Sequence, residues 1–219
     1  MKYFIANFKQ NFDSEQFQSW LHTFHPQLPP ETPVILAPPL PLLPLGSDFS
    51  FKLAAQSVST HQDGANTGQV GAHQLKGLVD YCIIGHSEVR KELGLTDQQI
   101  TAQAKLLRNE GIVPIVCLDT PYLESQITSL KRELLDLPEL IIAYEPLAAI
   151  GSGRPDTAAH ANEIAFKIKH LTRLTTPVIY GGSTTPDNAP DFLKQEYLDG
   201  LLVGKSCLNP LDFSLYFGK

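Results

Sequence analysis

The sequence has few of the residues that specialised metal-bound or disulfide-bonded folds require. Its 219 residues include three cysteines, Cys82, Cys117 and Cys207, which are far apart and form no C-x-x-C pair. This spacing argues against a disulfide framework or a zinc site and indicates the reduced thiols of a cytoplasmic protein. The seven histidines form no H-x-x-x-H pair with acidic residues nearby. We therefore expect no metal.

Long apolar runs and basic stretches are also missing. No apolar segment approaches the roughly 18 residues that cross a membrane, and the start MKYFIANFKQN contains no signal-peptide core. Seventeen basic residues against 23 acidic ones leave a net charge of −6, which makes the chain a poor electrostatic partner for nucleic acid. We expect a cytoplasmic protein that binds neither a membrane nor nucleic acid.

Short apolar runs rich in β-forming residues recur along the whole chain. Each is apolar throughout, which is typical of a strand buried on both faces of a parallel sheet. Eight such runs separated by helical stretches favour one closed barrel, a (β/α)₈ TIM barrel over residues 1–219, above an open sheet. The expected strands are Tyr3–Ala6, Val34–Ala37, Leu53–Gln56, Tyr81–Ile84, Val113–Cys117, Leu140–Tyr144, Val178–Tyr180 and Leu201–Val203.

Helix start signals lie between several of these runs. Asp13 precedes Ser14–Phe24, and Thr96 with Gln99 has capping-box spacing. The proline-rich segment Pro38–Ser47 predicts a short or distorted helix. Further helices are expected from Asp156 or Thr157, from Asp187, and within Leu211–Phe217.

Polar residues directly after three of the runs require an explanation. In a parallel barrel the reacting groups lie on loops at the carboxyl ends of the strands. Asn7 and Lys9 follow the first run, His86 follows the fourth, and Glu145 follows the sixth. A carboxylate at the end of an apolar strand is partly desolvated, which raises its basicity and suits proton abstraction beside a carbonyl. An imidazole just before a helix start is held neutral and can donate a proton to a carbonyl oxygen.

Glycine-rich turns follow the last three runs. Leu147–Gly153 is apolar and ends in G-x-G, which is the composition of a mobile lid. Gly181-Gly182-Ser183 and Gly204-Lys205-Ser206 follow the seventh and eighth runs. Backbone N–H groups in turns at these two places in a barrel are a recurring phosphate site.

Taken together, these segments resemble the triosephosphate isomerase family over essentially the whole chain. The chain is similar to a short, divergent member of that family. The resemblance rests on N-F-K at 7–9, I-G-H-S-E at 84–88, A-Y-E-P at 143–146, I-G-S-G at 150–153, Y-G-G-S at 180–183 and L-V-G at 202–204. Gln56 followed by Gly64–Gly68 is similar to that family's protruding loop at the dimer contact.

The resemblance implies an isomerase of glycolysis and gluconeogenesis that needs no cofactor. It would interconvert dihydroxyacetone phosphate and D-glyceraldehyde 3-phosphate through an enediolate. In that family's terms Glu145 is the catalytic base, His86 the electrophile, and Lys9, positioned by Asn7, the group that stabilises negative charge. Gly151, Ser183, Gly204 and Lys205 would bind the phosphate, and Ser87 and Glu88 would support these residues. A homodimer through the Gly64–Gly68 loop, with Thr67 reaching the neighbouring site, is also implied.

Four departures from the family pattern bear on rate and assembly. The lid has Ala148 where a tryptophan is usual, and Pro155 stands at a hinge where small flexible residues are usual. Lys205 replaces a common glycine, and Gln69 a common glutamate after the dimer loop. The alternatives are another phosphate-binding barrel enzyme, or a barrel that has lost catalysis and serves as a binding protein.

Overall fold

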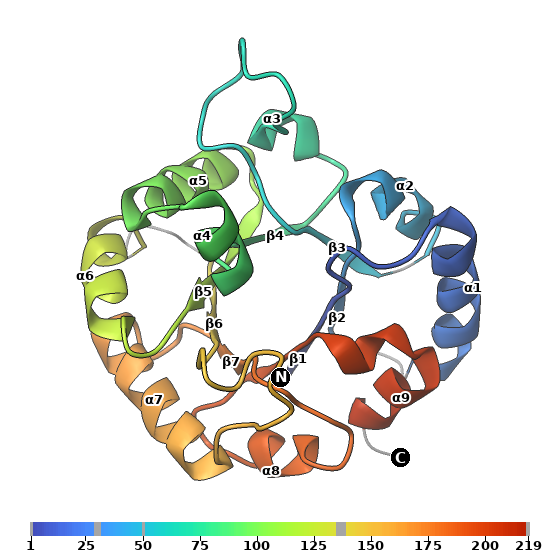
Figure 1. Ribbon diagram of the computed structural model, residues 1–219, viewed down its shortest axis with the longest axis vertical. Helices are drawn as coiled ribbons and strands as arrows, with labels where there is room; N and C mark the ends of the chain where they lie inside the picture. The colour runs from blue at the N-terminus through green and yellow to red at the C-terminus, as the bar shows by residue number, and fades with distance from the viewer. Residues whose placement is uncertain (1, 29–31, 50, 135–138, 218–219) are drawn as a thin grey trace.

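The computed structural model describes residues 2–28, 32–49, 51–134 and 139–217. Within them eight parallel strands follow one another in chain order around a closed barrel, and β8 pairs with β1. Figure 1 looks down this barrel, with the strands at the centre and the helices around them. The predicted TIM barrel is therefore confirmed. The strands are β1 (Tyr3–Asn7), β2 (Val34–Ala37), β3 (Lys52–Ala55), β4 (Tyr81–Ile84), β5 (Val113–Leu118), β6 (Ile141–Tyr144), β7 (Val178–Tyr180) and β8 (Gly200–Val203).

The helices form the outer layer of the barrel. Those at the expected places begin at the expected caps: the Asp13 and Thr96 side chains each accept a hydrogen bond from the backbone N–H three residues later, and Thr157 caps α7 in the same way. The helix α8 begins one residue later than predicted, since Asn188 and not Asp187 precedes it. The α-helices are α1 (Ser14–Phe24), α2 (Leu43–Gly46), α3 (Ala72–Leu75), α4 (Ser87–Leu93), α5 (Asp97–Asn109), α6 (Leu123–Leu134), α7 (Ala158–Leu171), α8 (Ala189–Leu193) and α9 (Pro210–Ser214).

Short 3₁₀ segments complete the ring. The proline-rich stretch after β2 folds as the 3₁₀ turn Leu40–Leu42 followed by α2, as its composition predicts. The helices α3 and α6 were not among the predicted elements. The remaining 3₁₀ segments are His25–Gln27, Lys205–Leu208 and Leu215–Phe217.

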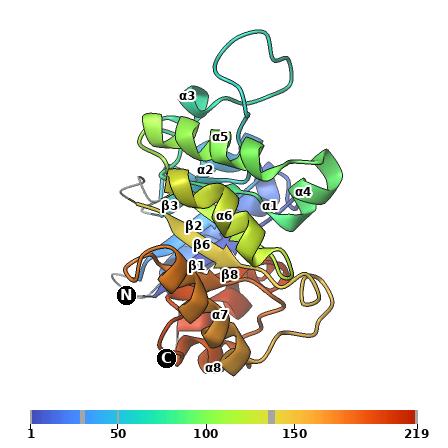
Figure 2. The ribbon, with the colours of Figure 1, turned by 90° about the vertical axis from the view of Figure 1, so that its left-hand side faces the viewer.

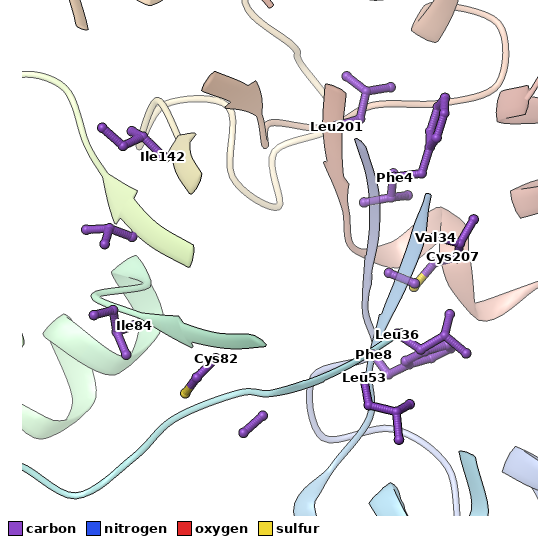
Figure 3. Close-up of a cluster of buried hydrophobic side chains, with 14 of the residues drawn as sticks. Phe4, Phe8, Val34, Leu36, Leu53, Cys82, Ile84, Ile142, Leu201 and Cys207 are labelled. Atoms are coloured by element: carbon purple, nitrogen blue, oxygen red, sulfur yellow. The ribbon is translucent and has the colours of Figure 1, made fainter. Parts of the chain in front are cut away.

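Two apolar cores result from the alternation of side chains along each strand. One set points outward and packs against the helices, as Figure 3 shows for Phe4, Leu36, Ile142 and their neighbours. The alternate set fills the barrel interior. That inner core consists of Ile5, Ile35, Ala37, Ala54, Ile83, Ile115, Cys117, Ile141, Ala143, Ile179 and Leu202.

The same alternation decides which residues point over the barrel mouth. On β6 the inner core contains Ile141 and Ala143, so Glu145 also points inward, whereas Tyr144 points outward to the helices. Tyr180 on β7 likewise points outward. The side chains of Glu145 and Tyr144 therefore lie on opposite sides of the barrel wall.

Two loops extend beyond the compact body. The segment between β3 and α3, which contains Gly64–Gly68, projects away from the barrel (Figures 1 and 2). The segment between β6 and α7, coloured gold in Figure 2, extends from the same end of the barrel as α4. Among the described residues no helix combines the length and the apolar character needed to cross a membrane. All three cysteines are buried free thiols.

Candidate active site

A cavity of about 700 Å³ lies at the carboxyl ends of the strands. Loops after β1, β4, β6, β7 and β8 surround it. Ser87 and Glu88 lie behind it, in the first turn of α4. All the residues that the sequence predicted to be catalytic or substrate-binding line this cavity: Asn7, Lys9, His86, Glu145, Gly151, Ser183, Gly204 and Lys205.

The Glu145 carboxylate is buried in the floor of the cavity, with 3% of the residue exposed. Its Oε1 lies 3.4 Å from Nε2 of His86. Its Oε2 has no hydrogen-bond partner among the described residues. Burial raises the pKa of Glu145, and the nearby His86 opposes the shift. A desolvated carboxylate with one unshared oxygen is a strong base, which fits proton abstraction.

His86 is the N-cap residue of α4, and this position fixes its tautomer. The backbone N–H of Glu88 donates to Nδ1 of the imidazole at 3.2 Å. An Nδ1 atom that accepts a hydrogen bond carries no proton, so the ring proton is on Nε2. Nε2 faces Glu145 and the cavity. The helix start therefore presents a neutral N–H donor to whatever binds there.

The Lys9 loop is held in a strained conformation by three neighbours. Lys9 has a φ of 51°, which non-glycine residues rarely adopt. Its backbone N–H donates to Oδ1 of Asn7 at 3.1 Å, and its carbonyl accepts from Nε2 of Gln56 at 2.9 Å. The Lys9 ammonium forms an ion pair with Glu88. These contacts keep a positive charge at the edge of the cavity.

The segment Leu147–Gly153, which we call the lid, is fastened to the turn after β7. The Ser183 hydroxyl donates to the carbonyl of Ala149 at 2.5 Å and accepts from the N–H of Gly153 at 3.2 Å. Ser183 has a φ of 50°, so this turn is also strained. The lid is therefore hydrogen-bonded to this turn, and its residues 150–153 line the cavity. The sequence had suggested the Ser183 backbone for phosphate binding but gave no signal for this role of its hydroxyl.

Glycines in the turn after β7 allow two close approaches. A Cβ atom on Gly182 would lie 2.6 Å from the hydroxyl of Tyr180, and one on Gly181 would lie 3.1 Å from Cγ of Glu145. Without these Cβ atoms the turn packs directly against Tyr180 and Glu145, and the N–H of Gly181 donates to the carbonyl of Tyr144 at 2.9 Å. Lys205, in the turn after β8, is exposed and contributes to the rim.

Two residues that contact predicted site residues were not themselves among the predicted site residues. Cys117 on β5 points into the barrel, where burial and then the charge of nearby Glu145 raise the pKa of its thiol well above the usual range. Gln56 bonds the carbonyls of Lys9 and Ala37, the latter at 2.8 Å. Only the alternation along β3, which turns position 56 inward, could have indicated this contact.

Comparisons with a family model and with individual proteins point to the same family. Residues 2–216 match the family model described as triosephosphate isomerase. The triosephosphate isomerase of Trichodesmium erythraeum is 35% identical over 223 residues, covering 94% of this chain and 92% of its own. That of Neurospora crassa is 34% identical over 239 residues and covers 95% of both chains.

Proposed function

Since the chain belongs to the triosephosphate isomerase family and has that family's activity, we propose that Glu145, His86, Lys9 and Asn7 carry out its reaction. The reaction moves one proton between adjacent carbons of a triose phosphate and leaves the oxidation state of the molecule unchanged. One group must therefore take a proton from carbon, and others must stabilise the oxyanion that forms.

Glu145 is the base in this scheme. It removes a proton from C1 of dihydroxyacetone phosphate and returns it to C2, which gives glyceraldehyde 3-phosphate. His86 donates its Nε2 proton to the C2 oxygen as the enediolate forms and then takes the proton of the C1 hydroxyl, which restores the neutral imidazole. The Lys9 ammonium stabilises the negative charge. The observation that carries the proposal is the 3.4 Å separation between His86 Nε2 and Glu145 Oε1 in a cavity that Lys9 also lines.

The phosphate group binds at the opposite side of the cavity. We assign it to the backbone N–H groups of Gly151, Ser183, Gly204 and Lys205, which lie in the lid and in the turns after β7 and β8. Ser87 and Glu88 support the site, Glu88 through its N–H bond to His86 and its ion pair with Lys9. Closure of the lid over bound substrate excludes water in this scheme, which strengthens each of these electrostatic interactions.

A coupled assay of the purified protein with each triose phosphate tests these roles. We expect Glu145→Ala and His86→Ala to lower kcat by about 10³-fold or more. Glu145→Asp, which withdraws the carboxylate by about 1 Å, should keep activity at a level lowered by about 10²-fold. Exposed Glu163 and His22 provide matched controls, and Glu163→Ala and His22→Ala should turn over at the wild-type rate. Wild-type turnover in Glu145→Ala would disprove the assignment of the base.

We also propose that residues 1–219 form one domain, that it works in the cytoplasm, and that two copies associate through the Gly64–Gly68 loop. The loop projects from the body with Thr67 exposed. Its base is closed by a 2.6 Å hydrogen bond from the Ser59 hydroxyl to Oε1 of Gln69, so Gln69 has a role within the chain. Light scattering of dilute, active protein should give the mass of a dimer, and a fully active monomer would contradict the proposal.

A further inference from the structure

Asp119 is a buried carboxylate beside the base, and the reaction as described so far does not use it. It follows β5 directly, and 4% of the residue is exposed. The backbone brings it next to Glu145, because Leu118 pairs with Tyr144 across the two strands. The carbonyl of Leu118 also accepts from the N–H of Glu145 at 2.9 Å. The chain therefore buries two carboxylates at the ends of neighbouring strands.

Gln126 on α6 holds the Asp119 side chain in place. The backbone N–H of Asp119 donates to Oε1 of Gln126 at 2.9 Å, and Nε2 of Gln126 donates to Oδ2 of Asp119 at 3.3 Å. Gln126 is itself buried. Oδ1 of Asp119 has no hydrogen-bond partner among the described residues. A fixed, buried charge of this kind acts on its ionisable neighbours, because little solvent screens it.

The charges around Asp119 favour its ionised form. Burial raises the pKa of the Asp119 carboxyl, and the charge of Arg90 opposes that shift most strongly. Arg90 is shared with other partners, since its Nη1 pairs with Asp97 at 2.7 Å and its Nε donates to the carbonyl of Gly85 at 2.7 Å. We therefore expect Asp119 to be ionised at neutral pH. The other ionisable groups that act on one carboxylate or the other are Lys9, His86, Asp97 and Cys117.

We propose that Asp119 is a positioning residue that acts through Glu145, by keeping a second negative charge beside the base. Like charges in one buried region repel each other, so each makes it easier for the other to take up a proton. Burial raises the pKa of Glu145, the charge of His86 opposes the shift, and the charge of Asp119 adds to it. The inference rests on the proposed role of Glu145.

The same charge should favour the proton transfer. When Glu145 takes a proton from carbon, negative charge moves from its carboxylate to an oxygen of the enediolate. Asp119 lines a second cavity of about 770 Å³, between α4 and the start of α6, and not the active-site cavity. We therefore expect Asp119 to repel charge on Glu145 more strongly than charge on the substrate, which favours the transfer.

The test combines NMR titration of the ¹³C-labelled carboxyl carbon of Glu145 in the free enzyme with steady-state kinetics. Asp119→Asn keeps the shape of the side chain and removes its charge. The midpoint of Glu145 should move to lower pH, and kcat should fall by roughly fivefold.

Two further variants serve as controls for the loss of charge. Asp119→Glu keeps the charge, and the second cavity leaves room for the longer side chain. Its midpoint and kcat should lie closer to wild type than to Asp119→Asn. Asp191→Asn removes one negative charge from the exposed surface of α8 and should behave as wild type.

The midpoint distinguishes an effect of charge from an effect of packing. A purely structural role would lower the melting temperature or kcat and leave the Glu145 midpoint where it is. An unchanged midpoint in Asp119→Asn would therefore overturn the proposal. If Asp119→Asn fails to fold, Asp119→Ser is a second neutral variant with a smaller side chain, and the same outcomes decide.

Failure of the proposed function is a separate result. The titration uses enzyme without substrate, so a lower midpoint in Asp119→Asn shows the interaction whether or not Glu145 is the base. Wild-type turnover in Glu145→Ala would disprove the base. A lower midpoint with wild-type kcat in Asp119→Asn would show that the interaction does not assist the reaction, and would overturn the present proposal alone.

Discussion

A methyl group on Gly181 would lie 3.1 Å from Cγ of Glu145 and 3.2 Å from its Oε1. The turn after β7 is thus packed directly against the Glu145 side chain, and a larger residue at position 181 would press on the carboxylate. We expect Gly181→Ala to displace the carboxylate slightly and to lower kcat by roughly tenfold, which is less than the loss of about 100-fold that a misplacement of about 1 Å can cause. Kinetics in both directions measure the effect.

A melting curve provides the control for that substitution. The change adds one methyl group at a tight contact, so the protein should remain folded with a modest loss of stability. Full activity in Gly181→Ala would show that the position of the carboxylate does not limit the reaction.

The loss of activity at low pH should reflect the burial of the Glu145 carboxylate. Burial raises the pKa of Glu145 above the ordinary value of 4.5, and only the deprotonated form can take a proton from carbon. Activity should therefore fall, as the pH is lowered, at a higher pH than an exposed glutamate would give. NMR titration of the ¹³C-labelled carboxyl carbon of Glu145 in the free enzyme separates this effect from ionisation of the substrate phosphate. A midpoint at or below 4.5 would contradict the prediction.

The same carboxylate should cost the enzyme stability at neutral pH. A group whose pKa is higher in the folded state binds more protons there than in the unfolded state, so the free energy of unfolding falls as pH rises between the two values. Glu145→Gln removes this charge and keeps the shape of the side chain. We expect the variant to be inactive and more stable than wild type above that window, with the difference shrinking toward low pH. Denaturant unfolding at several pH values measures it, and a variant less stable at pH 8 would refute the argument.

The barrel and most of the site could be predicted because each depends on local sequence. Continuous apolar runs indicate strands covered on both faces, and residues at their carboxyl ends must meet at one mouth. The contacts of the Ser183 hydroxyl with the lid could not be predicted in the same way. They depend on how the segment after β6 crosses the turn after β7, which is a matter of three-dimensional packing. The sequence marks Pro155 only as a departure at the hinge.

Gln56 offers the sharpest test of how the Lys9 loop is held. Its Nε2 donates to the carbonyls of Lys9 and Ala37 at 2.9 and 2.8 Å, so it links a strained loop to the end of β2. Gln56→Met keeps the length and loses the donors, and should lower kcat/KM by roughly tenfold. Gln56→Glu places a carboxylate against two carbonyl oxygens. It should lower kcat/KM further than Gln56→Met does, because electrostatic repulsion is added to the loss of the two hydrogen bonds.

The pair of variants distinguishes positioning from simple packing. If Gln56 only fills space, Gln56→Glu and Gln56→Met should behave alike and should change the melting temperature more than the kinetics. If it orients Lys9, the loss should appear in kcat/KM in the order Gln56→Glu, Gln56→Met, wild type. Lys9→Ala should then remove most of the difference between the variants, because the ammonium that Gln56 positions is no longer there. Equal effects of the Gln56 substitutions with and without Lys9 would show that the amide acts elsewhere.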